Sequence, residues 1–188
     1  MLSDEIRDLL QPVVRTQKVI WFAFIITIPL YIGLAYLVTN NAENTSSVSK
    51  TLEVILYAVS VVTAGGSIVY RRYIFSDAHL QKKIREEANP LQLAMDSKTG
   101  HVDPERLRRI ESLVPFEQKI LGLVVSLQVF NIISWALNES IAIYGLMLMF
   151  LSRNFSALFP FMLAAMILDL LMSPGTESVV ERAQQFVG

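Results

Sequence analysis

Cysteine is absent from this 188-residue chain, and histidine occurs only twice. The absence of cysteine excludes disulfides, thiolate chemistry and cysteine-based metal sites. The formal net charge of −1 gives no electrostatic reason to expect nucleic acid as a partner. The sequence also lacks a Ser/His/Asp set, a phosphate-binding glycine loop and a cluster of metal ligands. We therefore expect no enzymatic activity, no cofactor and no bound metal.

Charge is scarce over four long stretches, and the chain is 53% hydrophobic. These stretches cover residues 19–38, 54–70, 120–151 and 155–172, and they contain only two charged residues, Glu139 and Asp169. A helix needs about 20 apolar residues to cross a hydrocarbon core of ~30 Å. The sequence therefore predicts an all-α integral membrane protein with four transmembrane helices in a lipid bilayer.

The first apolar stretch is longer than the hydrophobic region of a signal peptide, so we expect it to remain as an anchor. The lysines and arginines predict the orientation of the spans. With four spans, only Lys50 and Arg153 of the 16 basic residues fall on the outer side, which leaves 14 on the other side. Cytoplasmic loops carry an excess of lysine and arginine. We therefore expect both termini to be cytoplasmic, and from the compact topology we expect a bacterial inner (plasma) membrane.

The predicted segments follow one another along the chain. They are an amphipathic cytoplasmic or interfacial helix (1–17), transmembrane helix 1 (18–39), an outer loop (40–50), transmembrane helix 2 (51–73), a cytoplasmic helical hairpin (74–118), a long transmembrane helix 3 (119–151), an outer turn (152–154), transmembrane helix 4 (155–173) and a cytoplasmic tail (174–188). We expect Pro12 to kink or end the first helix, because proline removes a backbone donor.

The cytoplasmic hairpin is predicted to contain two short helices joined by a turn over residues 95–103. Ser76 is the expected N-cap of the first helix. Asp103 is the expected N-cap of the second, with Pro104 at its first helical position. The hairpin is interpreted either as a membrane-surface connector with a solvated charged face or as a docking site for a soluble partner.

Two alternatives place Glu139 differently. In the first, residues 138–140 form the outer turn, and the last span carries Arg153 inside it. In the second, residues 152–154 form the turn, and Glu139 lies within a long helix. A carboxylic acid can avoid the free-energy cost of desolvation by binding a proton, whereas arginine stays charged. We therefore favour the second alternative.

In that alternative Glu139 belongs to a helix of about 48 Å, which must tilt or project from the membrane. At 100° per residue, Gln128 lies on nearly the same side as Glu139, with Asn131 at the flank. An ionisable residue at this depth is a functional hypothesis by default. Alternatively, Glu139 is a structural residue that bonds a neighbouring helix. Asp169, near the end of the last stretch, is interpreted only as a marker of the membrane boundary.

The segment ESIAIYGLMLMF, residues 139–150, resembles the carboxylate helix of the rotor-ring c-type subunits of rotary ATPases. In that family a mid-helix acid is followed by a small residue, apolar residues and an I-Y-G-L segment. The resemblance implies that Glu139 carries the ion, that Ser140 is a ligand as in sodium-binding members, and that Tyr144 supports the carboxylate. The threonine often found two positions after the acid is replaced by Ile141, which favours protons over sodium.

The sequence thus predicts a small polytopic membrane protein in which Glu139 binds a proton or a sodium ion. The predicted ion-binding residues are Glu139, Ser140, Tyr144, Gln128 and Asn131. The expected partners are the lipid bilayer and either further copies of the chain, in a homo-oligomer, or other membrane proteins, in a hetero-complex. The alternative is a non-catalytic accessory, assembly or scaffold subunit of a membrane complex.

Overall fold

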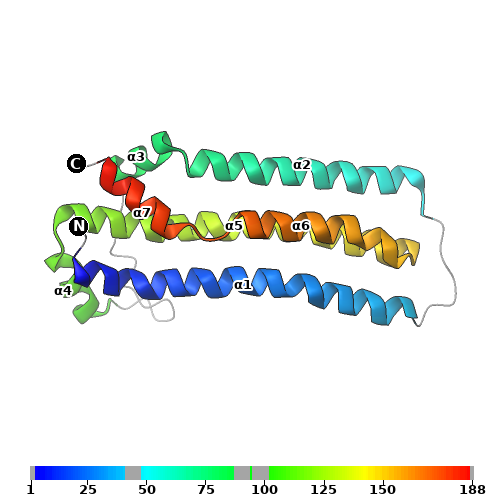
Figure 1. Cartoon of the computed structure of the whole chain (residues 1–188), viewed down its shortest axis with the longest axis horizontal. Helices are drawn as coiled ribbons and strands as arrows, with labels where there is room; N and C mark the ends of the chain where they lie inside the picture. Colours follow the sequence, from blue (N-terminus) through cyan, green and yellow to red (C-terminus); the bar gives the residue numbers. More distant parts are fainter. Residues whose placement is uncertain (1–2, 41–47, 87–93, 95–101, 187–188) are drawn as a thin grey trace. The chain divides into compact units, whose positions relative to one another are not determined.

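The computed structural model describes residues 3–40, 48–86, 94 and 102–186, and within these ranges every regular element is a helix (Figure 1). The described part contains no β-strand, which confirms the predicted all-α class. The elements in chain order are α1 (Asp4–Asn40), α2 (Lys50–Ile74), α3 (Asp77–Glu86), α4 (Pro104–Ser112), α5 (Pro115–Ser152), η2 (Phe155–Leu158), α6 (Phe159–Leu171) and α7 (Thr176–Gln185).

Three of these helices, α1, α2 and α5, are long and apolar enough to cross a membrane. Their length and composition indicate an integral membrane protein. The fourth predicted span corresponds to a shorter apolar stretch, Phe155–Leu171, which comprises η2 and α6.

The chain forms two compact units. Unit 1 comprises residues 1–18, 72–131 and 174–188, and unit 2 comprises residues 19–71 and 132–173. The helices α1, α2 and α5 each contribute residues to both units.

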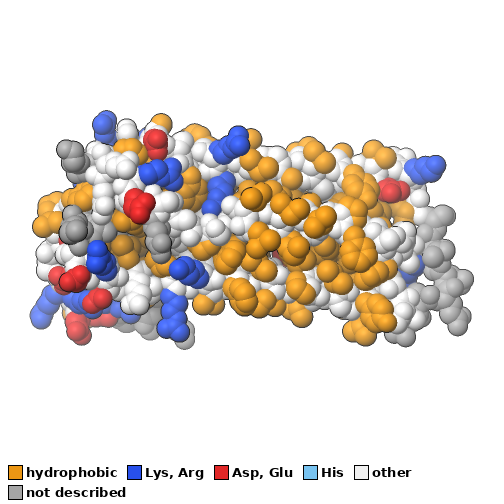
Figure 2. Space-filling view, in the orientation of Figure 1, with side chains coloured by type: hydrophobic (Ala, Val, Ile, Leu, Met, Phe, Trp, Pro, Cys, Tyr) orange, Lys and Arg blue, Asp and Glu red, His pale blue; other side chains and the backbone are white. Residues whose placement is uncertain are grey.

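Unit 2 is built around a hydrophobic cluster drawn from α1, α2, α5 and α6. Fully buried members include Ile28 on α1, Trp135 on α5 and Phe161 on α6. The outer surface is also apolar: Val62 is 74% exposed and Leu171 is 75% exposed. Figure 2 shows hydrophobic side chains spread over the visible face of these helices. Water would disfavour so large an apolar surface, whereas lipid tails solvate it.

Unit 1 buries the apolar face of the N-terminal residues, as their helical spacing predicts. Ile6, Leu9, Leu10 and Val13 of α1 are all buried. The expectation that Pro12 ends the helix is wrong, because α1 continues without a break from Asp4 to Asn40. Residues on both sides of Pro12 pack into the same core, and this packing offsets the missing backbone hydrogen bond.

Both predicted caps of the cytoplasmic hairpin are present at the starts of α3 and α4. The Ser76 hydroxyl accepts a hydrogen bond from the His79 backbone N–H at 3.3 Å. The Asp103 carboxylate accepts from the N–H groups of Glu105 at 3.0 Å and Arg106 at 3.3 Å. These side chains satisfy donors that a helix N-terminus leaves unpaired. Most of the predicted turn over 95–103 lies outside the described residues.

His79 on α3 packs between two aromatic rings in unit 1. Its ring centroid lies 5.1 Å from that of Tyr73 and 6.2 Å from that of Phe130. Burial lowers the pKa of His79, and the positive charges of Lys83 and Lys82 lower that pKa further. The imidazole is therefore neutral at pH 7.

The long helix α5 decides between the two alternatives for Glu139. It runs unbroken from Pro115 to Ser152, so Glu139 is helical and residues 138–140 form no turn. The chain reverses instead at Arg153, whose φ of 54° lies in the left-handed region. Asn154 then caps η2, its side chain accepting from the Ser156 N–H at 3.0 Å. The structure therefore confirms the second alternative, in which residues 152–154 form the turn and Glu139 lies within a long helix.

Candidate functional site

Glu139 lies in the part of α5 that belongs to unit 2, and its side chain is buried. Only 8% of the residue is exposed. Neither carboxylate oxygen has a hydrogen-bond partner among the described residues. An ionised carboxylate without partners in an apolar environment is strongly disfavoured, and binding a proton removes the charge.

A second acid, Asp169 on α6, is fully buried in the same unit. Its Oδ1 accepts a hydrogen bond from the Asn138 side-chain N–H₂ at 2.8 Å, and its Oδ2 has no partner within the described part of the chain. Asp169 is therefore packed inside unit 2 and bonded to another helix, a role that its interpretation as only a marker of the membrane boundary did not include. Its position on α6 turns it toward α5, whose Asn138 immediately precedes Glu139.

Asn138 connects three helices of unit 2 through its side chain. Its oxygen Oδ1 accepts a hydrogen bond from the Ser67 hydroxyl of α2 at 2.7 Å. Its nitrogen Nδ2 donates to Asp169 and also contacts the Met172 sulfur at 3.4 Å. Both ends of this amide are satisfied, so its orientation is fixed by its neighbours.

The C-terminal end of α6 is anchored by donors from three other helices. The indole of Trp21 donates to the Asp169 carbonyl at 2.8 Å, and the indole of Trp135 donates to the Met172 carbonyl at 2.9 Å. The guanidinium of Arg71 donates to the carbonyls of Met172 at 2.8 Å and Ser173 at 2.7 Å. These bonds satisfy carbonyls that a helix C-terminus leaves open, and they fix the backbone that carries Asp169.

Tyr31 of α1 completes the surroundings of Glu139. Its hydroxyl approaches the Glu139 carboxylate, and the Glu139 and Asp169 charges lie close enough to interact. No hydrogen bond of good geometry joins Tyr31 to Glu139 among the described residues. The site therefore contains two neighbouring buried carboxyl groups with three unpaired oxygens. Two negative charges here would repel each other and both would be desolvated, so a single negative charge is the favoured state.

The structure places the other predicted site residues less favourably for binding an ion beside Glu139. The Ser140 hydroxyl donates to the Ala136 carbonyl of its own helix at 2.9 Å. Tyr144 is half-buried and packs against the hydrophobic cluster of unit 2. Gln128 and Asn131 belong to unit 1, where Asn131 is buried.

Asn131 lines a small cavity of about 10 Å³ in unit 1, together with Gln17 and Thr176. The Thr176 hydroxyl donates to the Gln17 side-chain oxygen at 2.9 Å. The Gln17 nitrogen and the Asn131 oxygen find no partner in the described ranges. A cavity of this size between a donor and an acceptor fits one water molecule.

Four residues of this site are not among the residues predicted from the sequence, namely Asp169, Asn138, Ser67 and Tyr31. Each is polar and lies in an apolar stretch, which is the only sequence signal for them. Their common position depends on how α1, α2, α5 and α6 pack, and no spacing along the chain encodes it.

Comparisons with protein-family models, curated protein sequences and solved structures give no significant match to this chain. The resemblance to rotor-ring subunits therefore rests on residues 139–150 alone.

Proposed function

We propose that this chain is a small polytopic membrane protein whose Glu139–Asp169 pair binds and releases a proton inside the bilayer. The observation that carries this proposal is the burial of both carboxyl groups with three of their four oxygens unpaired by described residues. Buried acids in a membrane helix are uncommon, and they mark proton relays in pumps and transporters.

The two acids have different surroundings, which assigns them different roles. Asp169 accepts a hydrogen bond from Asn138, and such a donor stabilises the ionised form of a carboxylate. Glu139 has no such donor of good geometry within the described residues, so the proton resides on Glu139. When access to water changes, Glu139 releases this proton to water, and binding of another proton restores the state with a single negative charge. A coupled pair titrates as a unit rather than as two independent groups.

The same surroundings favour a proton over a sodium ion. Sodium requires several oxygen ligands at one point, and the described residues contain no group of three or more acidic, histidine or cysteine side chains that could hold a metal ion. The resemblance to rotor-ring helices supports the same choice, because Ile141 stands where sodium-binding members often carry threonine.

The proposal includes four spans with both termini in the cytoplasm, of which η2 and α6 form the last. Phe155–Leu171 rises about 25 Å if it is helical throughout, which is at the short end of what crosses a bilayer. The asymmetry of lysine and arginine supports this orientation.

Carbodiimide labelling tests the proposal, because the reagent attacks protonated carboxyl groups in apolar surroundings. We expect Glu139 in native membranes to be labelled at neutral pH, and we expect labelling to fall as the pH rises. Mass spectrometry of the labelled peptides provides the measurement, and the exposed Glu181 serves as the control that stays unlabelled. Equal labelling of Glu139 and Glu181, or none at Glu139 at any pH, would contradict the proposal. If sodium and no other cation protects Glu139 from labelling, the site binds sodium rather than a proton.

A second candidate function is that of a non-catalytic accessory subunit, and an open small-residue face on α2 favours it. A Cβ atom added at Gly65 or Gly66 would meet no described atom within 4 Å. Small residues at an open helix face allow another transmembrane helix to approach closely. In this case the Glu139→Gln substitution would leave function intact, and Gly65→Leu would abolish assembly with the partner.

A further inference from the structure

The side-chain amide of Asn138 can lie in two orientations in the interior of unit 2. Asn138, Ser67 and Asp169 are all fully buried there. An amide has an acceptor end, Oδ1, and a donor end, Nδ2, which have nearly the same shape. Turning the Asn138 amide by 180° would therefore preserve its packing and exchange a donor for an acceptor. Hydrogen bonding, rather than packing, decides which end faces Asp169.

Three neighbours of Asn138 select the orientation that the structure shows. The Ser67 hydroxyl donates to Oδ1 at 2.7 Å. Nδ2 donates to the Asp169 carboxylate at 2.8 Å and contacts the Met172 sulfur at 3.4 Å. A carboxylate and a thioether can only accept, so both require the N–H₂ end of the amide. In the turned orientation, Oδ1 would face an oxygen of ionised Asp169, and the two groups would repel each other.

The Ser67 hydroxyl has one hydrogen to donate, and Asn138 is its nearest acceptor. Two other acceptors, the Ser134 carbonyl and the Met172 sulfur, both lie 3.5 Å from the Ser67 oxygen. The bond of 2.7 Å to Asn138 is much shorter and also supplies the donor that a buried carbonyl oxygen needs. Ser67 therefore holds the Asn138 amide with its N–H₂ end toward Asp169.

Each orientation of the amide matches one protonation state of Asp169. An N–H₂ group stabilises the ionised carboxylate, whereas Oδ1 can only accept a hydrogen bond from a protonated one. The Glu139–Asp169 pair favours a single negative charge. When the charge is held on Asp169, the proton resides on Glu139, and when the amide is turned, the proton resides on Asp169.

We propose that Ser67 is a positioning residue that acts through the Asn138 amide to keep the proton on Glu139. This inference rests on the proposed binding of a proton by the acidic pair. Ser67 belongs to α2, which supplies neither acid, so the contact between α2 and α5 controls which acid is protonated. Loss of this contact frees the amide to turn. The O–H bond of Glu139 then breaks, an O–H bond forms on Asp169, and the total charge of the pair stays the same.

Carbodiimide labelling of the full chain in native membranes at pH 7 tests this inference, with label at each acid quantified separately by mass spectrometry. We expect the wild-type protein to be labelled mainly at Glu139. Ser67→Ala should raise the label at Asp169 about five-fold and lower it at Glu139, since one neutral hydrogen bond is lost. Asn138→Leu should raise the label at Asp169 by about ten-fold or more, since it removes a donor to a charged group.

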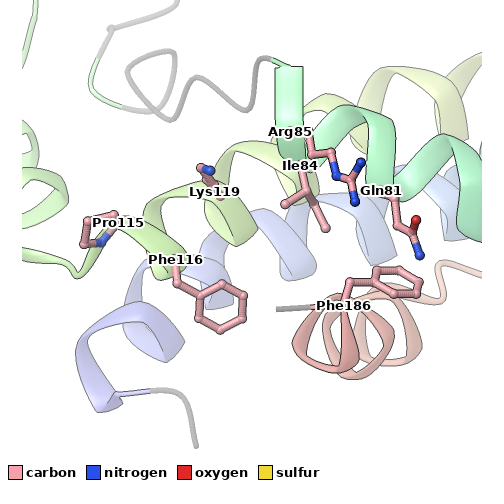
Figure 3. Close-up of a pocket in the computed structure, with 7 residues that line it drawn as sticks. All are labelled: Gln81, Ile84, Arg85, Pro115, Phe116, Lys119 and Phe186. Atoms are coloured by element: carbon pink, nitrogen blue, oxygen red, sulfur yellow. The ribbon is translucent and has the colours of Figure 1, made fainter. Parts of the chain in front are cut away.

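Two matched controls lie outside this hydrogen-bonded chain. Ser60→Ala removes a buried hydroxyl on the same helix as Ser67, where it donates to the Leu56 carbonyl at 2.8 Å. Gln81→Leu replaces an amide by leucine, as Asn138→Leu does, but on α3, where Gln81 lines a pocket of about 540 Å³ in unit 1 (Figure 3). Both control variants should be labelled as the wild-type protein is.

The opposite changes at the two acids distinguish positioning from loosened packing, which would expose both acids and raise both labels together. A parallel rise at Glu139 and Asp169 overturns the inference, as do Ser67→Ala and Asn138→Leu variants that match their controls. In either case, label at Glu139 in the wild-type protein would still support the proposed function. No label at Glu139 in the wild-type protein at any pH would contradict that function and this inference with it.

Thermal unfolding in detergent shows whether each variant is folded. If Asn138→Leu does not fold, Ser67→Ala and Ser67→Cys decide the outcome. Cysteine keeps a weak donor at this position, so Ser67→Cys should give a label at Asp169 between those of the wild-type protein and Ser67→Ala. A label at Asp169 that is the same in all three proteins would overturn the inference.

Discussion

Replacing Glu139 by glutamine is expected to abolish proton movement that depends on this chain. Glutamine has nearly the same shape and fills the same buried space, but it cannot bind and release a proton at accessible pH. We expect acid-driven proton uptake into proteoliposomes, measured with a pH-sensitive dye trapped inside, to fall at least ten-fold toward the rate of empty vesicles. Glu139→Asp keeps the carboxyl group on a shorter side chain and should retain part of the activity.

The same substitution at Glu53 is the matched control. Glu53 lies in the first turn of α2 and is exposed, so Glu53→Gln should leave proton uptake unchanged. Asp169→Asn removes the neighbouring negative charge and should lower the rate without eliminating it, because Glu139 remains. If Glu139→Gln and Glu53→Gln behave alike, the carboxyl pair does not carry protons, and the accessory-subunit function becomes the better explanation.

Adding a side chain at Gly145 is expected to destabilise unit 2 strongly. A Cβ atom there would lie 2.6 Å from the Cβ of Phe161 and 3.0 Å from its Cγ, closer than packed carbons approach. The Phe161 ring has little freedom to move, because it is buried and stacks on Tyr57 with centroids 4.6 Å apart. Overpacking of this kind costs about 1–3 kcal/mol for Gly145→Ala, and more for Gly145→Leu.

Gly66→Ala is the control for Gly145→Ala, because it changes helix propensity in the same way but adds no close contact. A Cβ atom added at Gly66 would have no described atom within 4 Å. Alanine at this position should therefore leave the stability unchanged or raise it by up to about 1 kcal/mol, because alanine favours a helix more than glycine does. Thermal unfolding in detergent should show a lower Tm for Gly145→Ala and an unchanged or higher Tm for Gly66→Ala. The double variant Gly145→Ala with Phe161→Leu should recover part of the loss, because the two sites are coupled. Equal Tm values for both alanine variants would show that α5 and α6 do not approach closely at Gly145.

The long-range arrangement of the α5–α6 region could be predicted in part from single residues. The choice between a turn at residues 138–140 and a turn at 152–154 followed from the chemistry of Glu139 and Arg153. A carboxyl group can be neutralised, whereas a guanidinium group cannot, and Arg153 indeed lies at the chain reversal. The caps Ser76 and Asp103 were equally predictable, because a cap depends only on residues within one turn.

The partners of Glu139 could not be predicted in the same way. Asp169 lies close to the end of an apolar stretch, and sequence position alone is compatible with either the membrane boundary or the interior. Its burial results from the packing of α6 on α5 and from bonds to Asn138 and Trp21. The predicted stripe of Gln128, Asn131 and Glu139 considered one helix in isolation, whereas the side chains that surround Glu139 come from other helices.

The central claim is that Glu139 holds a proton at neutral pH inside the membrane. Infrared spectroscopy of the reconstituted protein tests it directly, because a protonated carboxylic acid has a carbonyl band well separated from that of an ionised carboxylate. We expect such a band in the wild-type protein at pH 7, and we expect it to be absent in Glu139→Gln and retained in Glu53→Gln. Absence of the band in the wild-type protein at pH 7, or a band that persists in Glu139→Gln and disappears in Asp169→Asn, would contradict the assignment of the proton to Glu139.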